Sequence, residues 1–355
     1  MTGDRSKKTG ARSRKPVARI LLILTAVLLA VAPTPSRWVE RFYSNGIYPP
    51  LERFLTTHSN RVPFAVGDAL AAVAIVAVLA WSVHKLRSAG RRRIRALGAL
   101  ALDVATFAAL IYLLFLGLWG LNYRRTPLTR KLDYDPDRVS ADAARAMLRR
   151  TIETLNAESP AVHGREWPDG EELHDALAQS LRRAAAEAGA RAPLVFGKPK
   201  VSVADRYLGA TGIDGFTNPF GLEIVLNAEL VPPERPYVIA HEWSHLAGFA
   251  DESEAGFVGL IACLRSDRAA IRYSGWLALY QFLTERVTVE TPRLLPPVVA
   301  DLRSIVERVR RRYRPTLGQA QERIYDRFLK ANRVEEGVAS YGLMVRLVLG
   351  THLIE

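Results

Sequence analysis

The sequence predicts an α+β protein that is mostly α-helical, with N-terminal transmembrane helices followed by a domain that contains a small sheet. Three observations lead to this prediction. Long apolar runs are confined to residues 1–122, helical spacing of apolar residues prevails over residues 123–355, and an HExxH motif occupies residues 241–245. We therefore expect two domains, a membrane anchor over residues 1–122 and a domain outside the membrane over residues 123–355.

The anchor contains three apolar runs, at about residues 18–34, 64–83 and 96–121. The second and third reach the length of about 20 residues that a helix needs to cross a bilayer. The first is shorter, and its basic lead-in and small residues also fit a cleaved signal peptide. We favour an uncleaved span, because prolines and Trp38 follow it as at an interfacial exit. Three transmembrane helices are therefore predicted.

Basic residues predict the orientation of these helices. Six Lys/Arg precede the first run against one acid, and the link "HKLRSAGRRRIR" between the second and third runs has six Lys/Arg and no acid. The link over residues 33–63 balances four arginines with two glutamates. The positive-inside rule therefore places the N-terminus in the cytoplasm. Three crossings then put residues 123–355 on the outer side of the cytoplasmic membrane, so we expect a multi-pass protein with an extracytoplasmic domain.

The formal net charge of +13 sits almost entirely in the anchor. Residues 1–122 hold 17 Lys/Arg against 5 Asp/Glu, and the rest of the chain holds 32 against 31. Because the basic excess flanks apolar runs, it predicts contact with the lipid bilayer and no nucleic-acid partner. The single cysteine, Cys263, excludes an intrachain disulfide.

Patterns in residues 123–355 predict the elements of the outer domain. Residues 122–138 are polar and proline-punctuated, which predicts the exit from the membrane and a linker. Alternation predicts strands at 199–209 and 222–230, with a glycine-rich turn over 209–221 between them. The remaining segments have helical spacing. Helices are expected from Ser140, over 171–189, from about Pro236, from about Glu252, through "YSGWLALYQFL", and over 297–313, 317–331 and 335–350.

The motif is the strongest functional signal in the chain. His241 and His245 lie one helical turn apart on the same face, so their rings can bind one zinc ion. Glu242 is rotated by about 100° from His241, which suits a general base that takes a proton from water activated by the metal. This arrangement is typical of zinc hydrolases. The alternative is a pair of histidines hydrogen-bonded inside a buried helix.

A catalytic zinc needs a third protein ligand, and no further histidine follows the motif closely. The nearest acids on the next helix are Glu252 and Glu254. We favour Glu252, because it shares a helix face with the small residues Ala255 and Gly259, which would let that helix pack on the motif helix. Glu254 stays open as the alternative ligand, and both acids also suit a helix N-terminus without any metal.

The motif followed by "ESEAG" resembles the gluzincin site of membrane-embedded zinc proteases of the heat-shock and CAAX-prenyl types. There, a Glu in an ExxAD-like segment completes the zinc site; Glu252 stands at its place, Ala255 matches the Ala, and Gly256 replaces the Asp. The gap before Glu252 is also much shorter here. The chain more closely resembles a bacterial family of three-span proteins of unknown function with an outer zincin-like domain. The resembling blocks are "WGLNYRRTPL", "GFTNPFGLEIVLN", "HEWSHLAGFADESEA", "YSGWLALYQFL" and "VEEGVASYG".

The resemblance implies a zincin-like metallopeptidase domain and no established substrate. Zincins run an edge strand along the cleft, where a peptide can pair with it, and residues 222–226 are a candidate as well as an ordinary sheet strand. Tyr273, Tyr280 and Tyr341 are candidate donors to a developing oxyanion, although each also suits a packed core.

These patterns predict a membrane-anchored, zinc-dependent metallopeptidase. Its expected site has His241, His245 and Glu252 as ligands of Zn²⁺ and Glu242 as general base, and its expected partner is a peptide or protein substrate. One alternative is a zincin-fold protein that holds metal as a binding or scaffolding module without peptidase activity. Another is a polytopic structural or transport protein in which the histidines only pack. The sequence does not specify an oligomeric state.

Overall fold

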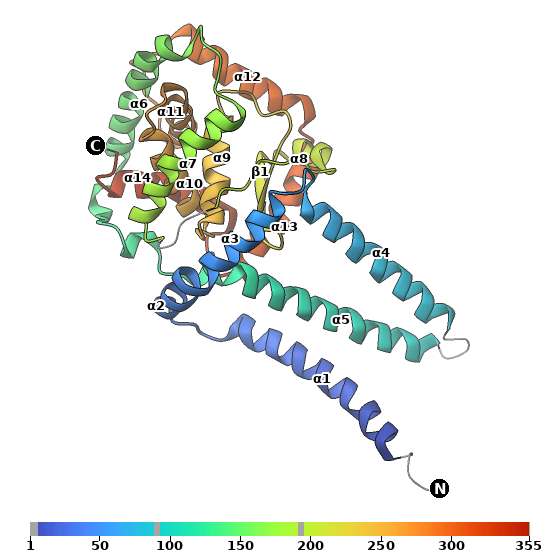
Figure 1. Cartoon of the computed structure of the whole chain (residues 1–355). Coiled ribbons are helices and arrows are strands. Elements are labelled where there is room, and N and C mark those ends of the chain that lie inside the picture. The colour runs from blue at the N-terminus through green and yellow to red at the C-terminus, as the bar shows by residue number, and fades with distance from the viewer. Residues whose placement is uncertain (1–5, 89–92, 191–194, 355) are drawn as a thin grey trace.

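The computed structural model describes residues 6–88, 93–190 and 195–354 of the chain. It is mostly helical, and the described residues form one two-stranded sheet. Three long helices extend from one side of a globular body that contains most of the other elements (Figure 1). These are α1 (Ser6–Val31), α4 (Val66–Arg87) and α5 (Arg93–Leu118).

Two of these helices have the length and apolarity of membrane spans. They are α4, of which no residue is buried by protein, and residues Leu97–Leu118 of α5. The apolar part of α1, Val17–Val31, meets the same test only together with Ser36–Ser59, and the two pieces are bent by 108°. The second and third predicted runs therefore lie on α4 and α5, and the first lies on α1. The part of the chain that the structure describes therefore has two or three membrane-length apolar helices.

A polar cluster joins the three long helices. Asp103 on α5 accepts hydrogen bonds from Arg19 on α1 at 2.7 Å and from Trp81 on α4 at 3.0 Å. Lys85 on α4 also pairs with the same carboxylate. Ionisable groups are costly in lipid unless they are paired, so this cluster fixes the three helices relative to one another.

The segment between α1 and α4 is helical and packs on the body. It forms α2 (Ser36–Trp38), the π-helix η1 (Val39–Ile47) and α3 (Tyr48–Ser59). The Tyr48 hydroxyl donates to Leu246 O at 2.9 Å, and Thr56 Oγ1 donates to Leu222 O at 2.7 Å. These bonds attach the segment to the elements that carry the motif.

The expected linker over residues 122–138 is instead packed into the body. It contains the short 3₁₀ turns η2 (Gly120–Arg124), η3 (Leu128–Arg130) and η4 (Pro136–Arg138). Leu128 is fully buried, and Arg125 donates to Gly248 O at 2.7 Å. The polar composition misled the prediction, because these polar groups bind other parts of the protein rather than water.

Most helices of the body lie where helical spacing predicted them. Ser140 caps the first of them, and its hydroxyl accepts from Ala143 N at 3.1 Å. Gly189 follows the second with a φ of +90°, a conformation that glycine adopts without strain. The helices are α6 (Ala141–Val162), α7 (Gly170–Glu187), α9 (Arg235–Leu246), α10 (Glu252–Leu264), α11 (Ala269–Thr284), α12 (Pro296–Arg312), α13 (Pro315–Ala331) and α14 (Met344–Gly350), with η5 (Gly337–Leu343) before the last.

The sheet differs from the prediction. Strands β1 (Gly215–Asn218) and β2 (Glu223–Leu226) are antiparallel, with Gly215 opposite Leu226. The prediction of a strand over 199–209 is wrong: only Lys200 bridges to β2, and α8 (Asp205–Thr211) follows. Asp68 explains the early end of pairing, because its carboxylate accepts from Ser202 Oγ and from Val203 N instead. β1 lies in the stretch expected to be a turn.

Candidate metal centre

The motif helix α9 and the following helix α10 are held close together by a tight turn and a glycine contact. Gly248, with a φ of +85°, ends α9 and reverses the chain. Asp251 then caps α10, and its carboxylate accepts from the backbone N–H groups of Ser253 and Glu254. A Cβ at Gly259 would lie 2.9 Å from the backbone nitrogen of His241, so only glycine permits this approach.

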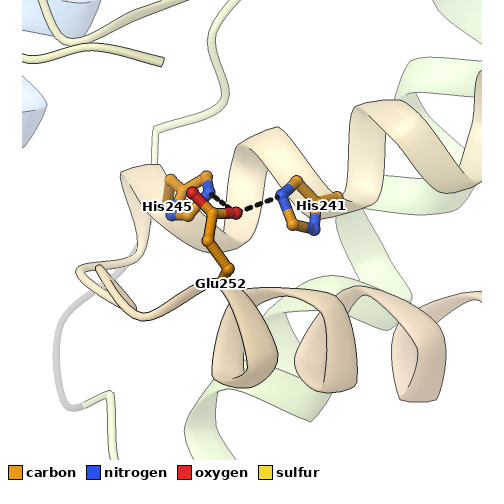
Figure 2. Close-up of side chains that lie close together, drawn as sticks. All are labelled: His241, His245 and Glu252. Atoms are coloured by element: carbon orange, nitrogen blue, oxygen red, sulfur yellow. Dashed lines mark hydrogen bonds and ion pairs between the residues drawn. The ribbon is translucent and has the colours of Figure 1, made fainter. Parts of the chain in front are cut away.

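The close packing brings three ligand-type side chains together (Figure 2). His241 Nε2 lies 3.2 Å from Glu252 Oε2, and His245 Nε2 lies 3.3 Å from the same oxygen. Ligand atoms at the corners of a tetrahedron with bonds of about 2.0–2.1 Å lie about 3.3 Å apart. Both histidine–glutamate separations therefore match the spacing of zinc ligands, and all three donors lie within 4.8 Å of one another.

Surrounding groups fix the orientation of the three donors. His245 Nδ1 lies 2.8 Å from Phe249 O, so its ring is held with Nε2 turned toward Glu252. Tyr325 on α13 donates its hydroxyl hydrogen to Glu252 Oε1, which leaves Oε2 for the histidines. Trp119, just beyond α5, donates from Nε1 to His245 O at 3.2 Å. Supporting bonds of this kind are usual around metal ligands.

The charges of Glu252 and the histidines strongly shift the pKa values of His245 and Glu252. Burial by itself would lower the pKa of His245, but the Glu252 carboxylate outweighs burial and raises this pKa to about 9. Burial would likewise raise the pKa of Glu252, and the two histidines outweigh it, so this pKa is held well below its usual range. The carboxylate is thus kept ionised, which is the form that binds a cation.

Glu242 lies next to the three donors, and its carboxylate is bonded to β1. It is 4 % exposed, and its Oε2 accepts from Thr217 Oγ1 on β1 at 2.9 Å. Burial raises its pKa, and the neighbouring His241 and His245 oppose that effect. A raised pKa makes the carboxylate a stronger proton acceptor, which suits a general base.

A cavity of about 630 Å³ opens onto these residues. Glu242, His241, His245 and Glu252 all line it. Among its other walls are three separate parts of the chain: the end of α5 and the residues after it, the β1 hairpin, and α13. The first wall contributes Phe115, Trp119 and Tyr123, the second Gly215, Phe216 and Thr217, and the third Tyr325 and Phe328. The cavity therefore combines a polar centre with aromatic walls.

β1, rather than residues 222–226, forms the strand edge beside the cavity. β2 pairs with β1 on one side and with Lys200 on the other, so it has no free edge at its centre. Asn227 N donates to Asp214 O at 2.8 Å. Hydrogen-bonded and non-hydrogen-bonded residue pairs alternate along an antiparallel ladder. Since Asp214 and Asn227 form a hydrogen-bonded pair, Gly215 and Thr217 belong to non-hydrogen-bonded pairs, and their main-chain groups point away from β2. Of the two interpretations left open for residues 222–226, the structure supports the ordinary sheet strand.

The other candidate residues lie apart from the three donors, with one exception. Glu254 Oε1 accepts from Leu128 N at 2.6 Å and is not part of the donor group. Tyr273 binds Asp301, and neither Tyr273 nor Tyr280 lines the cavity. Tyr341 does line it, and its ring stacks on His241 with centroids 6.5 Å apart.

Three supporting residues were not predicted from the sequence: Trp119, Thr217 and Tyr325. Trp119 and Thr217 lie in two of the resembling blocks, "WGLNYRRTPL" and "GFTNPFGLEIVLN", but nothing within those blocks assigns them to the site, and Tyr325 lies in no such block. Thr217 is 25 residues from its partner Glu242, and Tyr325 is 73 residues from Glu252. Only the packing of α13 and of the hairpin against α9 and α10 reveals them.

The fold and the site define a mostly helical protein with two or three membrane-length apolar helices and a cluster of two histidines and a glutamate in a cavity of its body. The chain belongs to the family described as "Protein of unknown function (DUF3810)", which it matches over residues 43–349. No curated protein and no solved structure is significantly similar to it.

Proposed function

We propose that the protein is a membrane-anchored, zinc-dependent metallopeptidase that hydrolyses peptide bonds on the outer side of the cytoplasmic membrane. The observation that carries the proposal is the convergence of His241 Nε2, His245 Nε2 and Glu252 Oε2 in a cavity that also contains Glu242. Two imidazoles and a carboxylate are a ligand set typical of catalytic zinc, with a coordination position left for water or substrate.

The residues fit a zinc ion in chemistry as well as in spacing. Glu252 is already ionised, and the imidazoles bind zinc in their neutral form, so binding would release the proton that His245 carries at neutral pH. His241, His245 and Glu252 would hold the ion, which when bound polarises the scissile carbonyl and lowers the pKa of water. Without a cation, the single Glu252 carboxylate would serve His241, His245 and Tyr325 at once.

Other residues of the cavity have roles that follow from their positions. Glu242 would take the proton from the attacking water and pass it to the leaving amine. The free edge of β1 at Gly215 and Thr217 would hold an extended peptide by main-chain hydrogen bonds. Tyr341, stacked on His241, is the tyrosine placed to donate toward a developing oxyanion.

The proposed location follows from the helices and the charges. Phe115 lies within the membrane-length part of α5 and also lines the cavity, which puts the site near the end of that helix. The basic residues before the first apolar run and between the second and third runs favour the cytoplasm for those segments, and hence the outer side for the body.

The exchange of Glu242 for Gln tests the proposal. We expect Glu242→Gln to retain zinc and to lose turnover of a mixture of quenched fluorogenic peptides by at least about 100-fold, the usual lower bound for removing a general base. Glu166→Gln, at an exposed loop position, is the matched control and should behave as wild type. A wild-type protein that holds zinc but neither cleaves the peptides nor binds a hydroxamate would instead be a metal-holding scaffold.

A further inference from the structure

The segment from Ser36 to Ser59 has one face that no part of the described protein covers. Its large apolar side chains on that face are Trp38, Phe42, Ile47 and Phe54, which are 67, 55, 61 and 59 % exposed. In a body that buries most of its large side chains, four exposed in one segment require a partner.

The π-helix η1 is what aligns these four residues. Trp38 and Phe42 are one α-turn apart, and Ile47 and Phe54 are two α-turns apart. Phe42 and Ile47 are five residues apart, which is one turn of a π-helix, and Tyr48 N donates to Tyr43 O across the same interval. An uninterrupted α-helix would place the two pairs on opposite sides.

Charge is sorted between the two faces of the segment. Its two acids are turned inward: Glu52 is buried, and Glu40 binds Arg125 and Lys131 of the body. The exposed face retains Arg37, Arg41 and Arg53. It is therefore apolar along its centre and purely basic at its margins, a combination that fits anionic headgroups above acyl chains.

The position of the segment matches this composition. It connects α1 to α4, along the side of the body from which the three long helices project (Figure 1). It is bent by 108° from the apolar part of α1, so when α1 crosses a bilayer the segment runs along the surface. Trp38 and Phe42 then lie at the depth where aromatic residues are enriched in membrane proteins.

We propose that residues 36–59 form an interfacial helix whose exposed face, Trp38, Phe42, Ile47 and Phe54, lies among lipid headgroups and binds anionic lipids through Arg37, Arg41 and Arg53. The opposite face bonds to Leu246 at the end of α9 and to Leu222 beside β2. The lipid surface therefore sets the height of the metal centre above the bilayer. This inference does not depend on peptidase activity.

Depth-dependent fluorescence quenching tests the proposal on the full-length protein in phospholipid nanodiscs. An environment-sensitive fluorophore is attached at Ile47→Cys and, separately, at Phe54→Cys; the native Cys263 is fully buried. Val73→Cys on α4, 69 % exposed, reports the membrane interior. Glu166→Cys, in the exposed loop between α6 and α7 on the side of the body away from the long helices, reports solvent.

We expect the Ile47 and Phe54 labels to be quenched about two-fold more by nitroxides near the headgroup than by nitroxides deep in the acyl chain, and the Val73 label to show the reverse. Spin-labelled phosphatidylserine should quench them more than spin-labelled phosphatidylcholine, and this excess should disappear when Arg37, Arg41 and Arg53 are all changed to Gln. Quenching as weak as at Glu166 would overturn the proposal. Stronger quenching by the deep nitroxides, as at Val73, would also overturn the proposal, because it would make the segment part of a transmembrane span.

Discussion

The helices α4 and α10 are both apolar around most of their circumference, yet they have opposite surroundings. Every residue of α10 except the last is buried, whereas no residue of α4 is. α10 has 13 residues, too few to cross a bilayer, and α4 has 22. α10 also has small residues, such as Gly259, where other helices approach. Length and the placement of small residues, more than hydropathy, therefore distinguish a helix covered by protein from one available to lipid.

The largest expected effect comes from filling the glycine contact of α10. Gly259→Leu would place side-chain atoms against the backbone of Ala240 and His241, where a Cβ already lies at 2.9–3.1 Å. We expect a loss of about 3 kcal/mol or more in the free energy of unfolding, measured in detergent, together with reduced zinc content.

Gly98→Leu is the matched control on a long helix. Nothing lies within 4 Å of a Cβ at Gly98, so the thermal midpoint should not change. Equal losses of stability at both positions would contradict the distinction between protein-covered and lipid-facing helices.

A smaller effect is expected from the buried acid Glu254 of α10. Burial, with a further contribution from Asp251, raises its pKa from 4.5 to about 7. Between these pH values the folded state holds a proton that the unfolded state releases. The contribution of Glu254 to the free energy of unfolding is thus fully present below pH 4.5 and is lost as the pH rises through 7.

Glu254→Gln removes this titration, while the amide oxygen can still accept from Leu128 N. Relative to wild type, the free energy of unfolding of the variant should therefore rise by about 2 kcal/mol as the pH increases from 5 to 8. The upper limit for one titrating group is about 1.4 kcal/mol per pH unit. Thermal midpoints of both proteins across this range provide the measurement. Parallel curves would show that Glu254 does not titrate as described.

The smallest effect on the body is expected from the polar cluster of the long helices. Asp103→Asn removes the charge that pairs with Arg19 and Lys85 and should weaken the association of α1, α4 and α5 by about 1 kcal/mol. Spin labels at the exposed positions Val27 and Leu70 should then show a broader distance distribution. The zinc content should be unchanged, and its loss would mean that the long helices control the metal centre directly.

The sequence predicted the helices of the body and the position of the motif because those depend on local signals. Ser140, Asp251 and the glycine turn at Gly248 act within a few residues of the helix ends that they define. The apolar runs on α4 and α5 are local signals of the same kind.

The incorrect predictions concern residues whose structure depends on interactions between distant segments. Residues 199–209 alternate like a strand, but Val203 is 92 % exposed and its N–H binds Asp68 on α4. β1 was hidden in a glycine-rich stretch, because its pairing with β2 is not visible in its own composition. Tyr325 could not be connected with Glu252, since only the packing of α13 brings them together.

The central claim is that two imidazoles and one carboxylate share a zinc ion. Metal analysis of wild type, His245→Ala, Glu252→Ala and Glu254→Gln, purified side by side, tests it most directly. We predict about one zinc per chain in wild type and in Glu254→Gln, and a loss of most of it in the other two. Wild-type protein without stoichiometric zinc, or full retention in Glu252→Ala, would contradict the assignment.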